Sequence, residues 1–165
     1  MKNKSLFTTK NLCLTALFTA IVCIATFIIQ IPIPLGYAHL GDCMILLSTH
    51  LLGAVGGMIS GGIGSALADI ISGFPIWALP TLIIKSIMPL VAYPFLRKNK
   101  IYFTIIGAVL SLLFMTLGYV VAGSIIYGSI ELGITQTPGL LLKSAVNLVA
   151  FILLYKLPFK KYLKF

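Results

Sequence analysis

The chain has 165 residues, of which 59% are hydrophobic and only 9% are charged. A soluble domain carries about 25% charged residues, so this composition excludes an ordinary water-soluble protein and indicates one embedded in a membrane. The formal net charge of +9 does not indicate nucleic-acid binding, because the basic residues stand in short connections, where they act as signals of membrane topology.

The apolar runs predict a single domain, residues 1–165, built as an all-α bundle of about six transmembrane helices of roughly 20 residues each. The first run is long, lacks a clear cleavage site and precedes further spans, so we interpret it as a helix and not as a signal peptide. Pro32 and Pro34 end it. The next two helices share about thirty residues, which requires a tight turn around residues 54–57. The expected helices cover residues 11–30, 41–54, 56–73, 77–96, 102–126 and 139–157.

The basic residues predict the orientation of the bundle. All Lys and Arg residues except Lys85 and Lys143 lie in the N-terminal segment, in residues 97–100 or in the C-terminal tail. An even number of spans places these three segments on one side, and the positive-inside rule makes that side cytoplasmic. The acidic residues, with His39 and Trp77, fall near the opposite connections, so we expect polar groups to converge on an outward-facing cavity. Pro34, Phe74 and Gln136 are expected outside.

The stretch of residues 53–85 carries an acid, Asp69, and a base, Lys85, in an otherwise apolar sequence. An ionisable group near the middle of a membrane helix is disfavoured by roughly 2.5 to 3.5 kcal/mol, so it normally faces the protein interior and marks a site. A plainer alternative is an ion pair between Asp69 and Lys85 that only joins two helices. Both interpretations stay open at this point.

Further polar residues lie near the same depth. Lys143 and Asn147 are four residues apart and share one face of a helix. Asp42 has two alternative roles, as a cap for the helix that it begins or as a ligand-binding group. His50 is interpreted as a hydrogen-bonded packing residue, since no acid lies within a helical turn of it.

Aromatic residues complete the expected pocket. Trp77, with Tyr119 and Tyr127, offers walls on which a small, flat, mostly neutral heterocycle could stack, while a few polar groups orient it. The candidate substrate-binding residues are Asp69, Trp77, Lys85, Lys143, Asn147, His39, Asp42, Glu131 and Tyr119.

Small residues mark a second kind of site. Cys13, Ala16, Ala20 and Cys23 follow a three-four-three spacing, which aligns them on one helix face of the kind that lets two membrane helices approach closely. The partner is either another protein or a helix of the same chain. The cysteines are odd in number and lack metal-ligand spacing, so we expect no metal site, and no cofactor is indicated.

Several function classes are disfavoured. No Walker loop and no zincin motif is present, and no nucleophile is paired with a base, so an enzyme is not expected. A self-contained secondary transporter or channel is the main alternative. Such proteins usually contain an internal repeat with broken helices, and the first three predicted helices show no convincing similarity to the last three.

Two stretches, YAHLGDCMILLSTHLLGAVGG and GGIGSALADIISGFPIWALPTLIIKSIM, resemble the substrate-binding S component of energy-coupling factor (ECF) vitamin transporters. They are most similar to the branch with riboflavin-type, hydroxymethylpyrimidine and pyridoxine S components. Ala16 and Ala20 match the alanine-x-x-x-alanine signature that these proteins carry in their first helix.

The resemblance implies a six-helix subunit of a bacterial cell membrane that has no energy source of its own. It would bind a vitamin or vitamin precursor from outside, with hydroxymethylpyrimidine or a pyridoxine-like compound as the best fit. It would then dock, through Ala16 and Ala20, on a transmembrane coupling subunit that two ATP-binding subunits drive.

Overall fold

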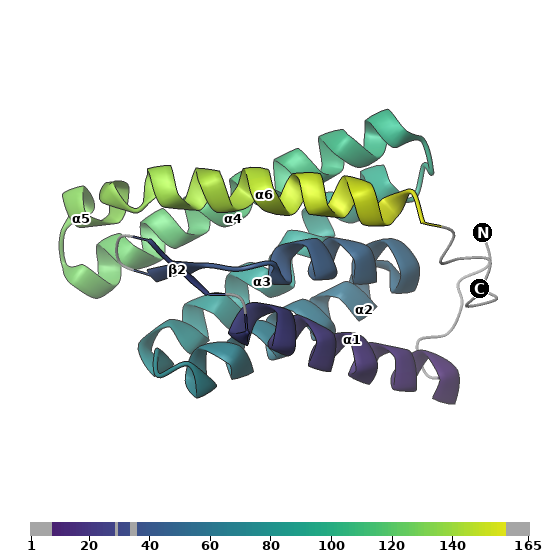
Figure 1. Cartoon of the computed structure of the whole chain (residues 1–165), viewed down its shortest axis with the longest axis horizontal. Helices are drawn as coiled ribbons and strands as arrows, with labels where there is room; N and C mark the ends of the chain where they lie inside the picture. Colours follow the sequence, from purple (N-terminus) through teal and green to yellow (C-terminus); the bar gives the residue numbers. More distant parts are fainter. Residues whose placement is uncertain (1–7, 29, 34–35, 158–165) are drawn as a thin grey trace.

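The computed structural model describes residues 8–28, 30–33 and 36–157, and its long helices run side by side along one axis (Figure 1). The all-helical class is confirmed for the body of this part of the chain, with one small β-hairpin added. The elements in chain order are α1 (Thr9–Phe27), β1 (Ile31–Ile33), β2 (Gly36–Ala38), α2 (Gly41–Ile71), α3 (Pro75–Leu96), α4 (Ile101–Tyr127), α5 (Ile130–Thr135) and α6 (Thr137–Tyr155).

Helix α2 folds back on itself at Gly53. This residue has φ 85° and ψ −177°, a conformation that costs glycine little because it has no Cβ. The two arms of α2 pack against each other, and the hydroxyl oxygens of Ser48 and Ser60 lie 2.8 Å apart across their interface. The tight turn expected at residues 54–57 is therefore found just before them.

Five segments of the described chain are long and apolar enough to cross a membrane. This supports a multi-pass membrane protein, while the expected six crossings and the cytoplasmic position of both termini stay predictions. The five segments are Thr9–Phe27, Gly41–Ile71, Pro75–Leu96, Ile101–Tyr127 and Ile130–Tyr155.

Two connections between the long helices contain short elements of their own. Strands β1 and β2 pair antiparallel, with Ile31 opposite Ala38 and Ile33 opposite Gly36. Helix α5 lies within the connection expected between the last two helices, and the Ser129 hydroxyl caps it by accepting from the Leu132 amide at 3.5 Å. Both elements are too short for a hydrophobic period to reveal them.

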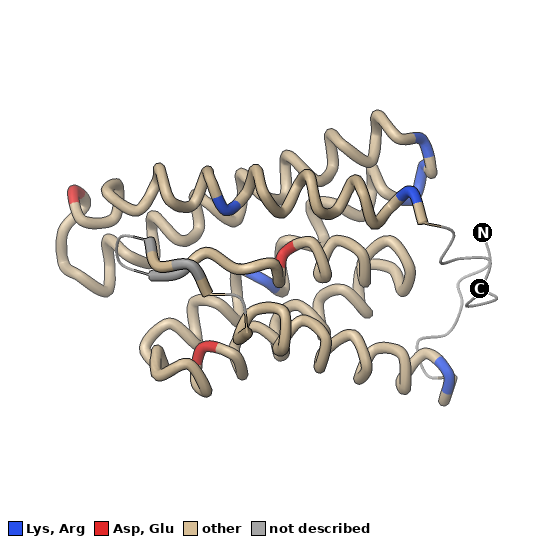
Figure 2. Tube along the Cα trace, viewed as in Figure 1, with Lys and Arg blue, Asp and Glu red and all other residues tan. Residues whose placement is uncertain are grey.

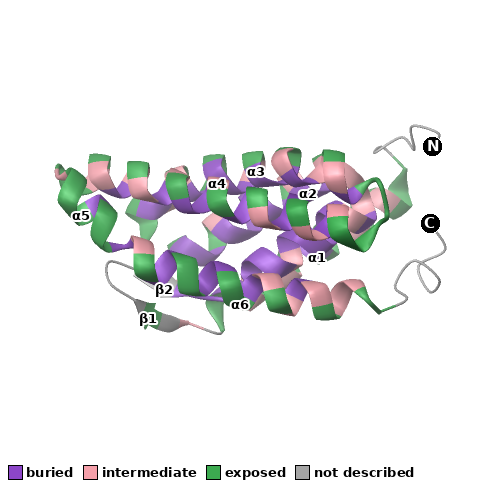
Figure 3. Cartoon of the chain, turned by 90° about the horizontal axis from the view of Figure 1, so that it is seen from above, coloured by how far each residue is buried: buried purple, intermediate pink, exposed green. Residues whose placement is uncertain are grey.

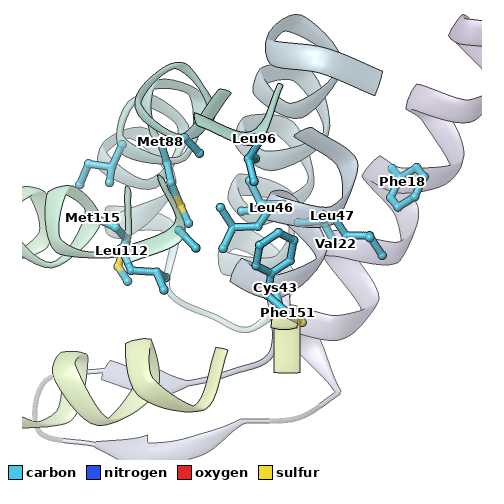
Figure 4. Packing of buried hydrophobic residues seen from close by; sticks show 14 of the residues in the cluster. Phe18, Val22, Cys43, Leu46, Leu47, Met88, Leu96, Leu112, Met115 and Phe151 are labelled. Atoms are coloured by element: carbon cyan, nitrogen blue, oxygen red, sulfur yellow. The ribbon is translucent and has the colours of Figure 1, made fainter. Parts of the chain in front are cut away.

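The apolar core lies between α2, α3, α4 and α6. Leu46, Met88, Leu112, Met115 and Phe151 belong to one cluster of buried hydrophobic residues, and Figure 4 shows their side chains from close by. Helix α1 packs mainly on α2 and adds two side chains to the same cluster. The core therefore holds together the four helices that carry the candidate site.

The outside of the bundle is also apolar. Leu79, Leu117 and Ile125 are among the large hydrophobic side chains that are more than 60% exposed. Figure 3 shows exposed positions along the outer faces of the helices. A soluble protein rarely exposes so large a continuous apolar surface. The surface suits contact with lipid tails.

The charges separate along the bundle (Figure 2). Basic residues at the start of α1, in the α3–α4 connection and at the end of α6 gather at one end, whereas the acid of α5 lies at the opposite end. This is the asymmetry on which the orientation was predicted. The remaining residues of that prediction, Lys2, Lys4, Pro34, Lys160, Lys161 and Lys164, lie outside the described residues.

Candidate functional site

A cluster of three charged side chains lies in the middle of the bundle. Asp42 comes from the first turn of α2, Lys85 from α3 and Lys143 from α6. Lys85 Nζ donates a hydrogen bond to Asp42 Oδ1, and Lys143 Nζ lies 3.5 Å from Asp42 Oδ2. The side chains of Asp42 and Lys85 are 0% exposed and that of Lys143 is 3% exposed. One carboxylate between two ammonium groups leaves a local excess of one positive charge.

The ion-pair partner of Lys85 is Asp42, and the alternative in which Lys85 pairs only with Asp69 does not describe this structure. Asp69 is buried near the end of α2, on its second arm. Asp42 was expected either to cap α2 or to bind a ligand. The cap position belongs to Leu40, and the carboxylate of Asp42 instead holds two lysines. The pairing joins three helices across the bundle.

Asn147 fixes the start of α2 against α6. Its Oδ1 accepts a hydrogen bond from the Cys43 amide at 2.9 Å, and its Nδ2 donates to the carbonyl oxygens of His39 at 2.7 Å and Lys143 at 2.9 Å. An asparagine amide group has two N–H donors, so both are used within the protein. Asn147 thus holds the backbone of Cys43, the residue that follows Asp42, and in this way positions Asp42. Asn147 has no donor left for a ligand in this conformation.

A band of aromatic rings leads from the start of α3 to the lysines. The ring centre of Trp77 is 5.8 Å from that of Tyr119 and 6.1 Å from that of Tyr127. Tyr119 in turn has its ring centre 5.2 Å from Lys143 Nζ and 5.4 Å from Lys85 Nζ, within the range of a cation–π contact. The structure therefore brings the expected aromatic and charged candidates together.

Thr81 is a member of this group that the sequence did not reveal. Its hydroxyl lies 2.9 Å from the Tyr119 hydroxyl, and it is buried on the same face of α3 as Trp77 and Lys85. The four-residue steps from Trp77 to Thr81 and Lys85 place them on one helix face. That spacing was the available signal, but a threonine in an apolar helix does not stand out by itself.

His39 lies in the connection between β2 and α2, beside the charged cluster, and its side chain is buried. Its Nδ1 accepts a hydrogen bond from the Gly41 amide at 3.0 Å. Burial holds the pKa of His39 well below its usual range, and the nearby ammonium group of Lys143 lowers this pKa further. His39 is therefore neutral at pH 7, and its ring acts as an acceptor at the entry to α2.

Glu131 does not join the cluster. It lies in the first turn of α5 and is exposed to solvent, and α5 stands at the end of the bundle away from the basic residues (Figure 2). Its expected role in binding has no support from the geometry of the described residues.

The small-residue face of α1 is open. Cys13, Ala16 and Ala20 are all exposed in the part of the chain that the structure describes. Cys23 is only partly exposed, at the edge of the face. The open face remains available to a partner helix.

Comparison with known proteins identifies the family of this chain. A family model described as "ECF-type riboflavin transporter, S component" matches residues 6–160. The chain belongs to this family. An S component is the substrate-binding subunit of an ECF transporter and not an enzyme, which confirms the expected class of protein.

Two individual proteins are similar to this S component. A solved structure, described as the S component of a bacterial ECF transporter, superimposes with a TM-score of 0.75 over 93% of this chain and 97% of that chain, at 23% sequence identity. A Pyrococcus woesei protein described as "Uncharacterized protein in gap 3'region" is 43% identical over 110 residues, which cover 65% of this chain and 74% of that protein. The first similarity supports the fold.

Proposed function

We propose that this S component captures an aromatic heterocyclic vitamin or vitamin precursor from outside the cell, and that the ligand binds against Trp77, Tyr119 and the buried charges. The best candidates are hydroxymethylpyrimidine and pyridoxine-like compounds. The observation that carries the proposal is the Lys85–Asp42–Lys143 cluster beside the aromatic band.

The chemistry of these groups supports a flat ligand with polar substituents. The two lysines supply ammonium donors, and a hydrogen bond to a charged group contributes about 1.5 to 3 kcal/mol. The indole and phenol rings favour a flat partner, with aromatic contacts contributing about 0.5 to 1.5 kcal/mol beyond burial. The ring centre of Tyr119 is 5.8 Å from that of Trp77 and 5.2 Å from Lys143 Nζ. A single ring with one or two polar substituents that binds against Tyr119 would therefore have both the indole and an ammonium group near it.

Riboflavin is the second candidate, because the matching family is named for its transport. Its tricyclic ring offers carbonyl oxygens and ring nitrogens as acceptors for the lysines. Its tricyclic ring needs more room than a single ring does. The comparison of the two ligand sizes is therefore part of the test.

The test uses the fact that the chain contains one tryptophan, so intrinsic indole fluorescence reports on Trp77 alone. Purified protein is titrated separately with hydroxymethylpyrimidine, pyridoxine and riboflavin. We expect saturable quenching by a single-ring compound and a loss of affinity in Lys143→Met, while Lys98→Met, at an exposed lysine, binds as the wild type does. Quenching by riboflavin alone would establish the second candidate, and no quenching by any of the three would reject the proposal.

We also propose that uptake requires a transmembrane coupling subunit and two ATP-binding subunits, with docking through the Ala16 and Ala20 face. The open small-residue surface of α1 supports this. Vesicles that contain the S component alone should bind the ligand without accumulating it, and the energising module with ATP should restore uptake. Accumulation by the isolated subunit along a solute gradient would favour a secondary transporter.

A further inference from the structure

Gln136, at the junction of α5 and α6, is a buried amide that the charged cluster does not use. Its side chain is 4% exposed, and Nε2 has no hydrogen-bond acceptor among the described residues. Buried side-chain amides in folded proteins nearly always have a partner, because leaving a donor unsatisfied is unfavourable. An amide kept here without one points to a partner that is not part of the chain.

The amide of Gln136 lies at the edge of Trp77. A Cβ placed on Gly123 of α4 would lie 2.0 Å from Gln136 Nε2, 3.2 Å from Gln136 Cδ and 3.4 Å from Trp77 Cη2. The amide and the indole edge therefore meet at one point, over the bare backbone of Gly123. Any side chain at position 123 would displace the amide, so glycine makes room for Gln136 in this place.

This point belongs to the same buried band as the charges but lies at its other end. Trp77 connects Gln136 to Tyr119, and Tyr119 contacts both lysines. A ring that stacks on Trp77 would have one edge toward the lysines and another toward Gln136. The two ends of the band thus offer donors to opposite edges of one ligand.

We propose that Gln136 is a substrate-recognition residue, whose Nε2 donates a hydrogen bond to an acceptor on the edge of the heterocycle that faces α5 and α6. The acceptor is a ring nitrogen, a carbonyl oxygen or a hydroxyl oxygen. The proposal rests on the proposed function and extends it, because it adds a third element of specificity to the aromatic wall and the lysines. It also makes α5 and its connection to α6 a part of the binding site.

The principal test is Gln136→Leu, which keeps the approximate size of the side chain and removes the amide. The variant and the wild type are titrated with hydroxymethylpyrimidine, pyridoxine and riboflavin by Trp77 fluorescence, and their melting temperatures are measured without any of these compounds. We expect the Kd of the compound that binds the wild type to rise about ten- to a hundredfold. We expect the melting temperature to stay equal or to rise, because a buried unsatisfied donor has been removed.

A second variant, Gly123→Ala, tests the geometry. The added methyl group meets the end of the flexible Gln136 side chain, so the protein should fold with that side chain turned away and bind the compound about as weakly as Gln136→Leu does. The double variant should bind no more weakly than either single variant, since both remove the same interaction. Thr135→Val, at an exposed position of α5, is the matched control and should bind normally.

The outcomes separate this proposal from the proposed function. Wild-type binding with unchanged Kd in Gln136→Leu would overturn the role of Gln136, including the case in which a bridging water alone satisfies its amide, and would leave the proposed function standing. A lowered melting temperature that accounts for the loss of binding, or additive losses in the double variant, would also overturn it. Absence of binding by the wild type would reject both.

Discussion

Replacing Asp42 with asparagine tests the charged cluster most directly. Asp42→Asn keeps the size of the side chain but removes the negative charge between Lys85 and Lys143. The wild-type cluster has a net charge of one, and the variant has two ammonium groups with their shared counter-ion gone. Breaking a buried ion pair by removing one partner costs about 3 to 5 kcal/mol.

This cost is large for a protein of ordinary stability, which is about 5 to 15 kcal/mol. Lys85 and Lys143 are 0% and 3% exposed, so water offers them little compensation in the folded state. We therefore expect a clear decrease in the denaturant concentration at the unfolding midpoint. Ligand affinity should fall as well, because the lysines lose the group that orients them.

The assay is equilibrium unfolding of detergent-solubilised protein, followed by Trp77 fluorescence and by circular dichroism. The double variant Asp42→Asn with Lys85→Met returns the cluster to a net charge of one, so it should recover most of the lost stability. Glu131→Gln, at an exposed acid, controls for loss of an acid in general and should unfold as the wild type does. An unfolding midpoint for Asp42→Asn equal to that of the wild type would refute the reasoning.

Three further predictions concern orientation, docking and pH. In a background without the native thiols, Glu131→Cys should be labelled in intact cells and Asn99→Cys only after permeabilisation; the reverse pattern would invert the topology. Ala16→Leu should block uptake by the complete transporter and leave ligand binding by the isolated subunit nearly intact, because the larger side chain prevents close helix approach; equal loss of both would contradict docking at this face. The folded state keeps His39 neutral because its pKa is lowered, whereas the unfolded chain binds a proton below about pH 6.5. Stability should therefore decrease as the pH falls below about 6.5, by about 1.4 kcal/mol per pH unit, and melting curves should show that His39→Gln removes this component.

Much of the site could be predicted because ionisable residues are conspicuous in an apolar sequence. Asp42, Lys85 and Lys143 were all candidates for that reason, and their depth in the bundle followed from the helix spans. Their pairing could not be predicted. Lys85 is 43 residues away from Asp42. Asp42 and Asp69 lie on opposite arms of α2, on either side of the reversal at Gly53, so the packing of these arms determines which acid pairs with Lys85. Asp69 was considered as the partner because it lies with Lys85 in one apolar stretch.

The role of Gln136 shows a different limit. A glutamine in a connection between helices gives no signal, since such residues are usually solvated. Its burial depends on the absence of a side chain at Gly123, on another helix. The connection holds the short helix α5, and Gln136 follows directly at its C-terminal end. Contacts of this kind arise only from the tertiary structure.

The hydrogen bonds of Asn147 have a consequence for biogenesis. They join the start of α2 to α6 across 104 and 108 residues of sequence. Chains are synthesised from the N-terminus, and their earlier parts generally begin to fold first. Asp42 and Lys85 can meet as soon as α3 is inserted, but Lys143 and Asn147 arrive only with the last helix. The Lys85–Asp42–Lys143 cluster is therefore completed only when α6 is in place, and a nascent chain arrested before α6 would hold Asp42 and Lys85 without the second lysine.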